Sequence, residues 1–74
     1  MKFTVEISDD DLKHINALIE RTNRRDDDAN THGTLSLEIL ARMLLEDVAL
    51  AERRPGSWEG SHMTTVLAAH GYDV

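Results

Sequence analysis

The first eight residues alternate between polar and apolar side chains. Phe3, Val5 and Ile7 are apolar, and the residues between them are polar. A period of two in residues that favour β structure predicts a half-buried β-strand over residues 2–8. The pattern predicts no second strand, and a lone strand leaves both of its edges unpaired. We therefore expect this strand to pair with the same strand of a second copy of the chain.

After this segment the apolar residues recur at helical spacing. Ser8 is a good N-cap, and the aspartates at 9–11 would occupy the first turn, where carboxylates favour the helix dipole. The first helix is expected to end near Arg24. Residues 26–33 are polar and show no periodicity, which predicts a loop.

Two further helices are expected. Gly33 and Thr34 would open the second helix, whose apolar residues cover most of its circumference. A helix that is apolar on several sides is buried on several sides, which again favours a dimer core. The third helix is predicted to run from an N-cap at Ser61 to His70, with Gly71 as its stop.

The order strand, helix, loop, helix resembles the ribbon-helix-helix family. The resemblance covers residues 2–50. Small polar, apolar and polar residues open the second helix in that family, and the matching positions here are Thr34, Leu35, Ser36, Glu38 and Ile39. The resemblance implies a mainly α fold with one N-terminal β-strand, in an intertwined ribbon-helix-helix homodimer. We expect this core at residues 1–51, followed by a C-terminal extension with a short helix at residues 52–74.

The family resemblance also implies a function, which is sequence-specific DNA binding by a repressor or antitoxin. An antiparallel β-ribbon would enter the major groove of double-stranded DNA, which is wide enough to admit it. Backbone N–H groups at the start of the second helix would bind a phosphate. The residues expected to contact bases are Lys2, Thr4 and Glu6, and those expected to bind phosphate are Thr34, Leu35 and Ser36.

The charge of the chain favours a different kind of partner. The 74 residues include 8 Lys and Arg against 14 Asp and Glu, for a net charge of −6, whereas DNA binding draws affinity from neutralising phosphates. The alternative is therefore an acidic protein-binding module on the same scaffold, such as a phage-type inhibitor of a host protein or a DNA mimic. Its candidate partner-binding residues are Asp26, Asp27, Asp28, Trp58 and Tyr72.

Other kinds of chemistry find little support in the sequence. There is no cysteine, so disulfides, thiolate metal sites and thiol nucleophiles are excluded. No two of the four histidines are spaced i, i+4, and no nucleophile, base and acid group together, so we expect no metal, no cofactor and no enzymatic activity. No apolar run reaches the roughly 20 residues of a membrane span, and no secretory signal is recognisable. A cytoplasmic protein of bacterial or phage origin is expected.

Overall fold

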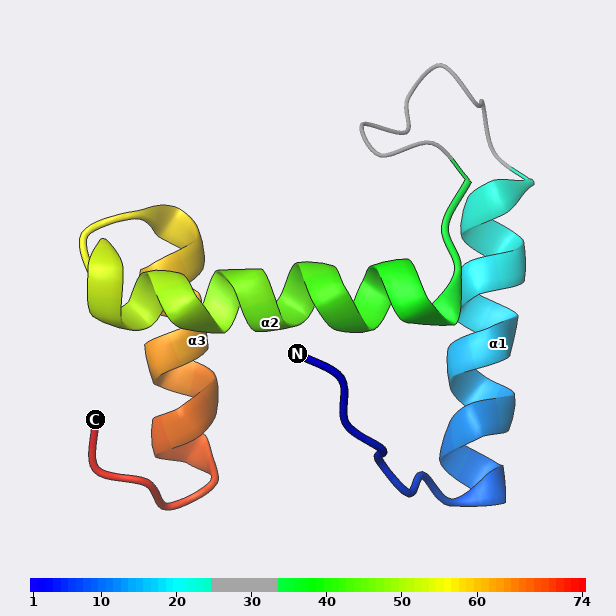
Figure 1. The fold of residues 1–74 in the computed structure, drawn as a ribbon, viewed down its shortest axis with the longest axis horizontal. Helices are drawn as coiled ribbons and strands as arrows, with labels where there is room; N and C mark the ends of the chain where they lie inside the picture. Colours follow the sequence, from blue (N-terminus) through cyan, green and yellow to red (C-terminus); the bar gives the residue numbers. More distant parts are fainter. Residues whose placement is uncertain (25–33) are drawn as a thin grey trace. The chain divides into compact units, whose positions relative to one another are not determined.

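The computed structural model describes residues 1–24 and 34–74, and the described residues form three α-helices. Helix α1 spans Asp9–Asn23, α2 spans Leu37–Arg53 and α3 spans Trp58–Ala69 (Figure 1). The chain divides into two compact units, Met1–Leu37 and Glu38–Val74. The first unit holds α1, and the second holds nearly all of α2 together with α3.

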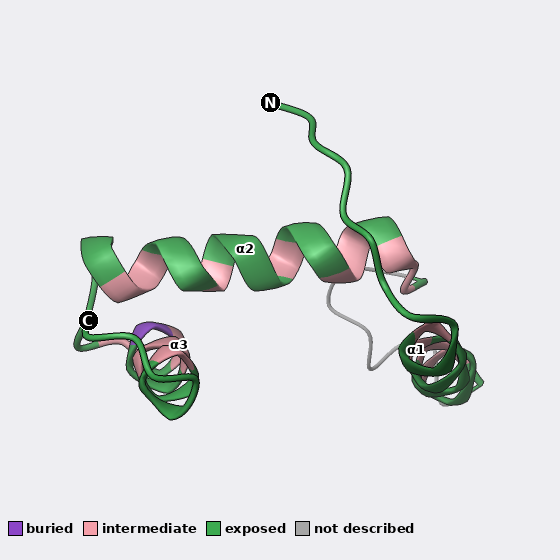
Figure 2. Cartoon of the chain, turned by 90° about the horizontal axis from the view of Figure 1, so that it is seen from below, coloured by how far each residue is buried: buried purple, intermediate pink, exposed green. Residues whose placement is uncertain are grey.

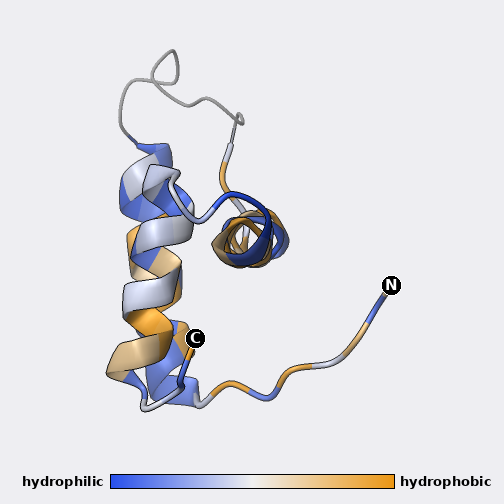
Figure 3. Ribbon diagram, turned by 90° about the vertical axis from the view of Figure 1, so that its left-hand side faces the viewer, coloured by the Kyte–Doolittle hydropathy of each residue, from blue (hydrophilic) through white to orange (hydrophobic). Residues whose placement is uncertain are grey.

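The predicted N-terminal strand is absent. Residues 1–8 form neither helix nor strand, and all of them are exposed, Val5 to 62%. Figure 3 shows their alternating hydropathy. The alternation is therefore present, but these residues form no β-strand. A strand is held by hydrogen bonds to a neighbouring strand, and the described residues offer none. The fold-class prediction, with its N-terminal β-strand and ribbon, is therefore wrong: the described chain is mainly α.

Helix α1 begins and ends as its sequence predicts. Ser8 is the N-cap, and its hydroxyl oxygen accepts a hydrogen bond from the Asp11 amide at 3.1 Å. The carboxylates at residues 9–11 occupy the first turn, where they meet the positive end of the helix dipole. Arg24 is the C-cap, and its amide donates to the Glu20 carbonyl at 3.1 Å. The Ser8 cap and the acidic first turn are local interactions that account for the start of this helix.

Helix α2 begins later than predicted. Thr34, Leu35 and Ser36 precede it, and the helix starts at Leu37. The Asn23 side chain accepts a hydrogen bond from the Leu35 amide and donates one to the Leu35 carbonyl, both at 2.8 Å. These two bonds tie the chain to the end of α1 just before α2 begins. The predicted loop at residues 26–33 lies outside the described residues, as does Gly33.

Helix α3 starts earlier than predicted. Its N-cap is Ser57, not Ser61, and the Ser57 hydroxyl accepts from the Gly60 amide at 3.1 Å and donates to the Arg54 carbonyl at 2.7 Å. Ser57 offers the same cap chemistry as Ser61, and its hydroxyl is also hydrogen-bonded to the residue that follows α2. The predicted stop is confirmed, since Gly71 takes a φ of +89°, a conformation that favours glycine.

The backbone of Gly60 lies close to the backbone at the end of α2. A Cβ atom at this position would lie 2.6 Å from the Leu50 carbonyl oxygen and 2.7 Å from that of Arg54, which is closer than real Cβ atoms come. Gly60 is also the one buried residue of the three helices, at the start of α3 (Figure 2). The absence of a side chain therefore lets the backbone of α3 rest against the end of α2.

Candidate functional site

The described residues contain no buried hydrophobic side chain. Small folded domains gain most of their stability from apolar surface removed from water. The exposed apolar side chains are therefore candidates for contact with a partner. Trp58 is 70% exposed, Tyr72 65% and Leu45 50%. The exposed large hydrophobic residues are Met1, Phe3, Val5, Ile7, Leu18, Leu44, Leu45, Val48, Trp58, Val66, Tyr72 and Val74.

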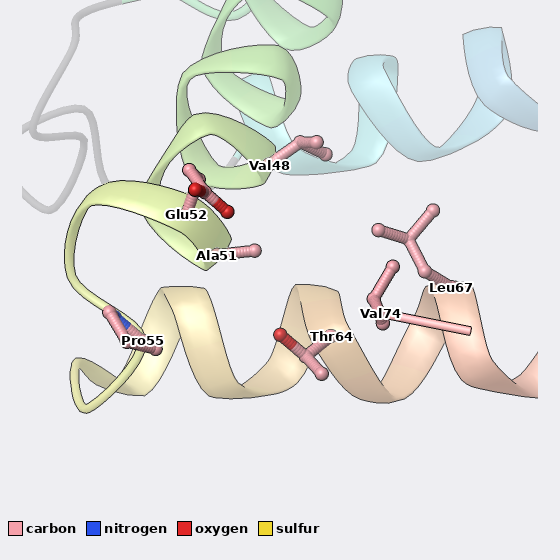
Figure 4. Close-up of a pocket in the computed structure, with 7 residues that line it drawn as sticks. All are labelled: Val48, Ala51, Glu52, Pro55, Thr64, Leu67 and Val74. Atoms are coloured by element: carbon pink, nitrogen blue, oxygen red, sulfur yellow. The ribbon is translucent and has the colours of Figure 1, made fainter. Parts of the chain in front are cut away.

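A groove lies in the second unit, where α3 packs beside the C-terminal part of α2 (Figure 4). Its cavity volume is about 390 Å³. The turn at Gly71 brings the C-terminal residues back along α3, where the Tyr72 amide donates to the Leu67 carbonyl at 3.1 Å. The lining residues are Val48, Ala51 and Glu52 of α2, Pro55 of the connection, Thr64 and Leu67 of α3, and Val74.

The groove is built for apolar contact. Five of its seven lining residues are apolar. The Thr64 hydroxyl donates to the Gly60 carbonyl at 2.9 Å, so its proton is already engaged, and Glu52 supplies the one ionisable side chain of the lining. Within residues 1–24 and 34–74, no three His, Asp, Glu or Cys side chains gather as a metal site would require. The groove can therefore receive apolar side chains, and it presents no nucleophile paired with a base.

Trp58 and His62 form a stacked aromatic pair at the start of α3. Their ring centroids are 3.9 Å apart and the rings are inclined by 27°. The His62 Nδ1 lies 2.7 Å from the Trp58 carbonyl oxygen, and because that oxygen can only accept, Nδ1 carries the proton. The stack covers one face of the indole and leaves most of Trp58 in water.

The residues predicted to contact DNA are placed as follows. Lys2, Thr4 and Glu6 are exposed in the segment without secondary structure. Thr34 is exposed, whereas Leu35 and Ser36 are half-buried. The Leu35 amide, one of the predicted phosphate donors, is already bonded to Asn23. Neither set forms a base-reading or phosphate-binding arrangement in the described residues, and both roles stay predictions.

The predicted partner-binding residues fall into two groups. Asp26, Asp27 and Asp28 lie outside the described residues. Trp58 and Tyr72 are both exposed in the second unit. The sequence pattern predicts neither the groove nor the close approach at Gly60, because both arise where α3 packs against the end of α2.

No protein-family model, no curated protein and no solved structure matches this chain. In the part of the chain that the structure describes, no helix is long and apolar enough to cross a membrane.

Proposed function

We propose that this chain is a self-associating α-helical protein, which completes its hydrophobic core by pairing with a second copy. One observation carries the proposal: the described residues bury no hydrophobic side chain and expose twelve large ones. Single exposed apolar residues are normal on soluble proteins, but a helical chain with no apolar core is not stable by itself.

Energetics favours association over an isolated monomer. Burying one Val, Leu, Ile or Phe side chain contributes roughly 1.5–3 kcal/mol, and ordering each residue costs a similar amount. A chain of 74 residues without cysteine has no disulfide with which to offset that cost. Contact with a second copy of the chain would remove exposed apolar residues from water.

Within this proposal the partner is a second copy of the chain, as the sequence predicts. Homodimer contacts are richer in apolar side chains than the rest of a protein surface. The exposed apolar residues of α2, which are Leu44, Leu45 and Val48, offer such a surface. A dimer would carry a charge of −12, twice −6, so its contact has to form where acidic side chains are few.

The test follows helix content during unfolding at several protein concentrations. An obligate dimer unfolds to separate chains, so its unfolding midpoint rises with protein concentration. We expect far-UV circular dichroism to show a midpoint that rises across the micromolar range. A cooperative transition with the same midpoint at every concentration would contradict the proposal.

DNA binding is the other candidate function, and it stays a prediction. Its support is the exposure of Lys2 and Thr4 in the N-terminal segment, where a nucleic acid could reach them. Selection from randomised duplexes at low salt tests it, with Lys2→Ala and Thr4→Ala as variants that should lose the selected duplex. Failure to enrich any sequence would rule this function out.

A further inference from the structure

The N-terminal segment, residues 1–8, carries large apolar side chains that lie in water. Met1, Phe3, Val5 and Ile7 are all exposed, and they are four of the twelve exposed large hydrophobic residues. The segment forms neither helix nor strand, so no secondary structure fixes the path of its backbone. It therefore presents a short apolar stretch that can follow the shape of a surface on which it docks.

The groove of the second unit is an acceptor of matching character. Its volume of about 390 Å³ lies within the roughly 300–1,000 Å³ of pockets that enclose small ligands, so it holds a few side chains and not a helix. Figure 4 shows Val48, Leu67 and Val74 around the same space. Val48 and Val74 are themselves exposed large hydrophobic residues, so docking the four apolar residues of the segment here brings six of the twelve into one contact.

The charges of the segment and the groove are complementary. Lys2 is the one charged side chain of residues 1–5, and Glu52 is the one ionisable side chain of the groove lining, where it is exposed. Glu6 follows Lys2 by four residues, which is roughly 13 Å along an extended chain, so it lies clear of Glu52 when Lys2 pairs with that carboxylate. Two chains of charge −6 repel wherever carboxylates meet, whereas opposite charges meet in this contact.

We infer that the N-terminal segment of each copy docks in the groove of the other copy, with Lys2 beside Glu52. The inference rests on the proposed self-association and names its contact. Within one chain all eight residues are exposed, so the second copy supplies the groove. The exchange is reciprocal, as in a two-fold dimer that swaps identical segments. Side chains make the contact, and no β-strand is needed.

The length of the segment connects the groove with the rest of the exposed α2 surface. Val48 lines the groove, and Leu44 lies one helical turn before it, which is roughly 6 Å along the helix axis. Eight extended residues span roughly 26 Å. A docked segment can therefore fill the groove and continue over Leu44 and Leu45, which are exposed on the same helix.

The test exchanges the two charges. Lys2→Glu and Glu52→Lys are studied separately and as an equimolar mixture, with molar mass measured by light scattering across the micromolar range. We expect each variant alone to dimerise about tenfold more weakly than the wild type, because like charges then meet in both grooves. The mixture should regain the wild-type mass, because each groove of a mixed dimer again receives a segment of opposite charge.

Two further variants complete the test. Glu46→Lys makes the same charge change at an exposed residue of α2 outside the groove lining, and it should dimerise at least as tightly as the wild type, because it lowers the net repulsion. Phe3→Ser should weaken dimerisation by at least about tenfold, because a large apolar side chain no longer enters the groove. Circular dichroism at high concentration should show equal helix content in the wild type, Glu52→Lys and Glu46→Lys.

The outcomes separate the docking from self-association. A wild-type mass of two chains that both charge variants and Phe3→Ser retain would overturn the docking and leave self-association standing. A mixture no tighter than its separate variants would overturn the exchange between copies, as expected if each segment occupied the groove of its own chain. A single-chain mass of the wild type at every concentration would overturn both.

Discussion

Gly60 of α3 and the Leu50 carbonyl of α2 lie so close that a Cβ atom on residue 60 would stand 2.6 Å from the carbonyl oxygen. The neighbouring Arg54 carbonyl would lie at 2.7 Å from the same atom. Both obstacles are backbone atoms, which cannot move aside as a flexible side chain can. This contact therefore fixes how α3 packs against the end of α2 in the second unit.

Gly60→Ala should destabilise the packing of α2 against α3. The added methyl group forces the two backbones apart, and overpacking of this kind costs roughly 1–3 kcal/mol. Urea unfolding followed by circular dichroism measures the loss. Gly56→Ala is the matched control, since no atom lies within 4 Å of its Cβ position, and it should leave the free energy of unfolding unchanged or slightly raised. Equal stability of both variants would show that the contact is not close.

The sequence predicts the N-cap of α3 at Ser61, whereas the structure has it at Ser57. Ser57→Ala removes the hydroxyl that accepts from the Gly60 amide and donates to the Arg54 carbonyl, and we expect a loss of about 0.5–2 kcal/mol. Ser61→Ala should cost nothing, because residue 61 lies inside the helix and alanine is the better helix former. Thermal unfolding of the two variants compares them directly. A larger loss for Ser61→Ala would place the cap where the sequence predicted it.

Asn23→Ala should release the segment that leads into α2. The change removes both hydrogen bonds to the Leu35 backbone and leaves a half-buried amide and carbonyl without their partner, at a cost of about 1–3 kcal/mol. Hydrogen exchange at the Leu35 amide measures the effect, and we expect its protection to disappear. Glu20→Ala, an exposed change in the same helix, serves as the control and should leave that protection intact. Retained protection in Asn23→Ala would contradict the bonding scheme.

The helices were predictable where local chemistry determines them. Ser8 and the three aspartates after it define the start of α1, and Gly71 ends α3 because a left-handed turn favours glycine. Each of these signals acts within a few residues, so periodicity and capping rules are sufficient to locate it.

The absence of the strand, the start of α3 and the groove depend on contacts between distant residues, which periodicity does not encode. Alternation at Phe3, Val5 and Ile7 describes side chains, whereas a strand also needs a neighbour to bond its backbone, and the described residues supply none. The choice of Ser57 over Ser61 is linked to its hydrogen bond with the end of α2. The groove likewise arises from packing between α2 and α3. Trp58 is exposed in the second unit, and its role in partner binding stays a prediction.

The central claim is that this chain completes its core with a second copy, and sedimentation equilibrium of the wild-type protein tests it most directly. The account predicts a molar mass of twice 8.3 kDa at high micromolar concentration, falling towards a single chain on dilution as helix content falls with it. A fully helical protein with the mass of one chain at every concentration would contradict the account.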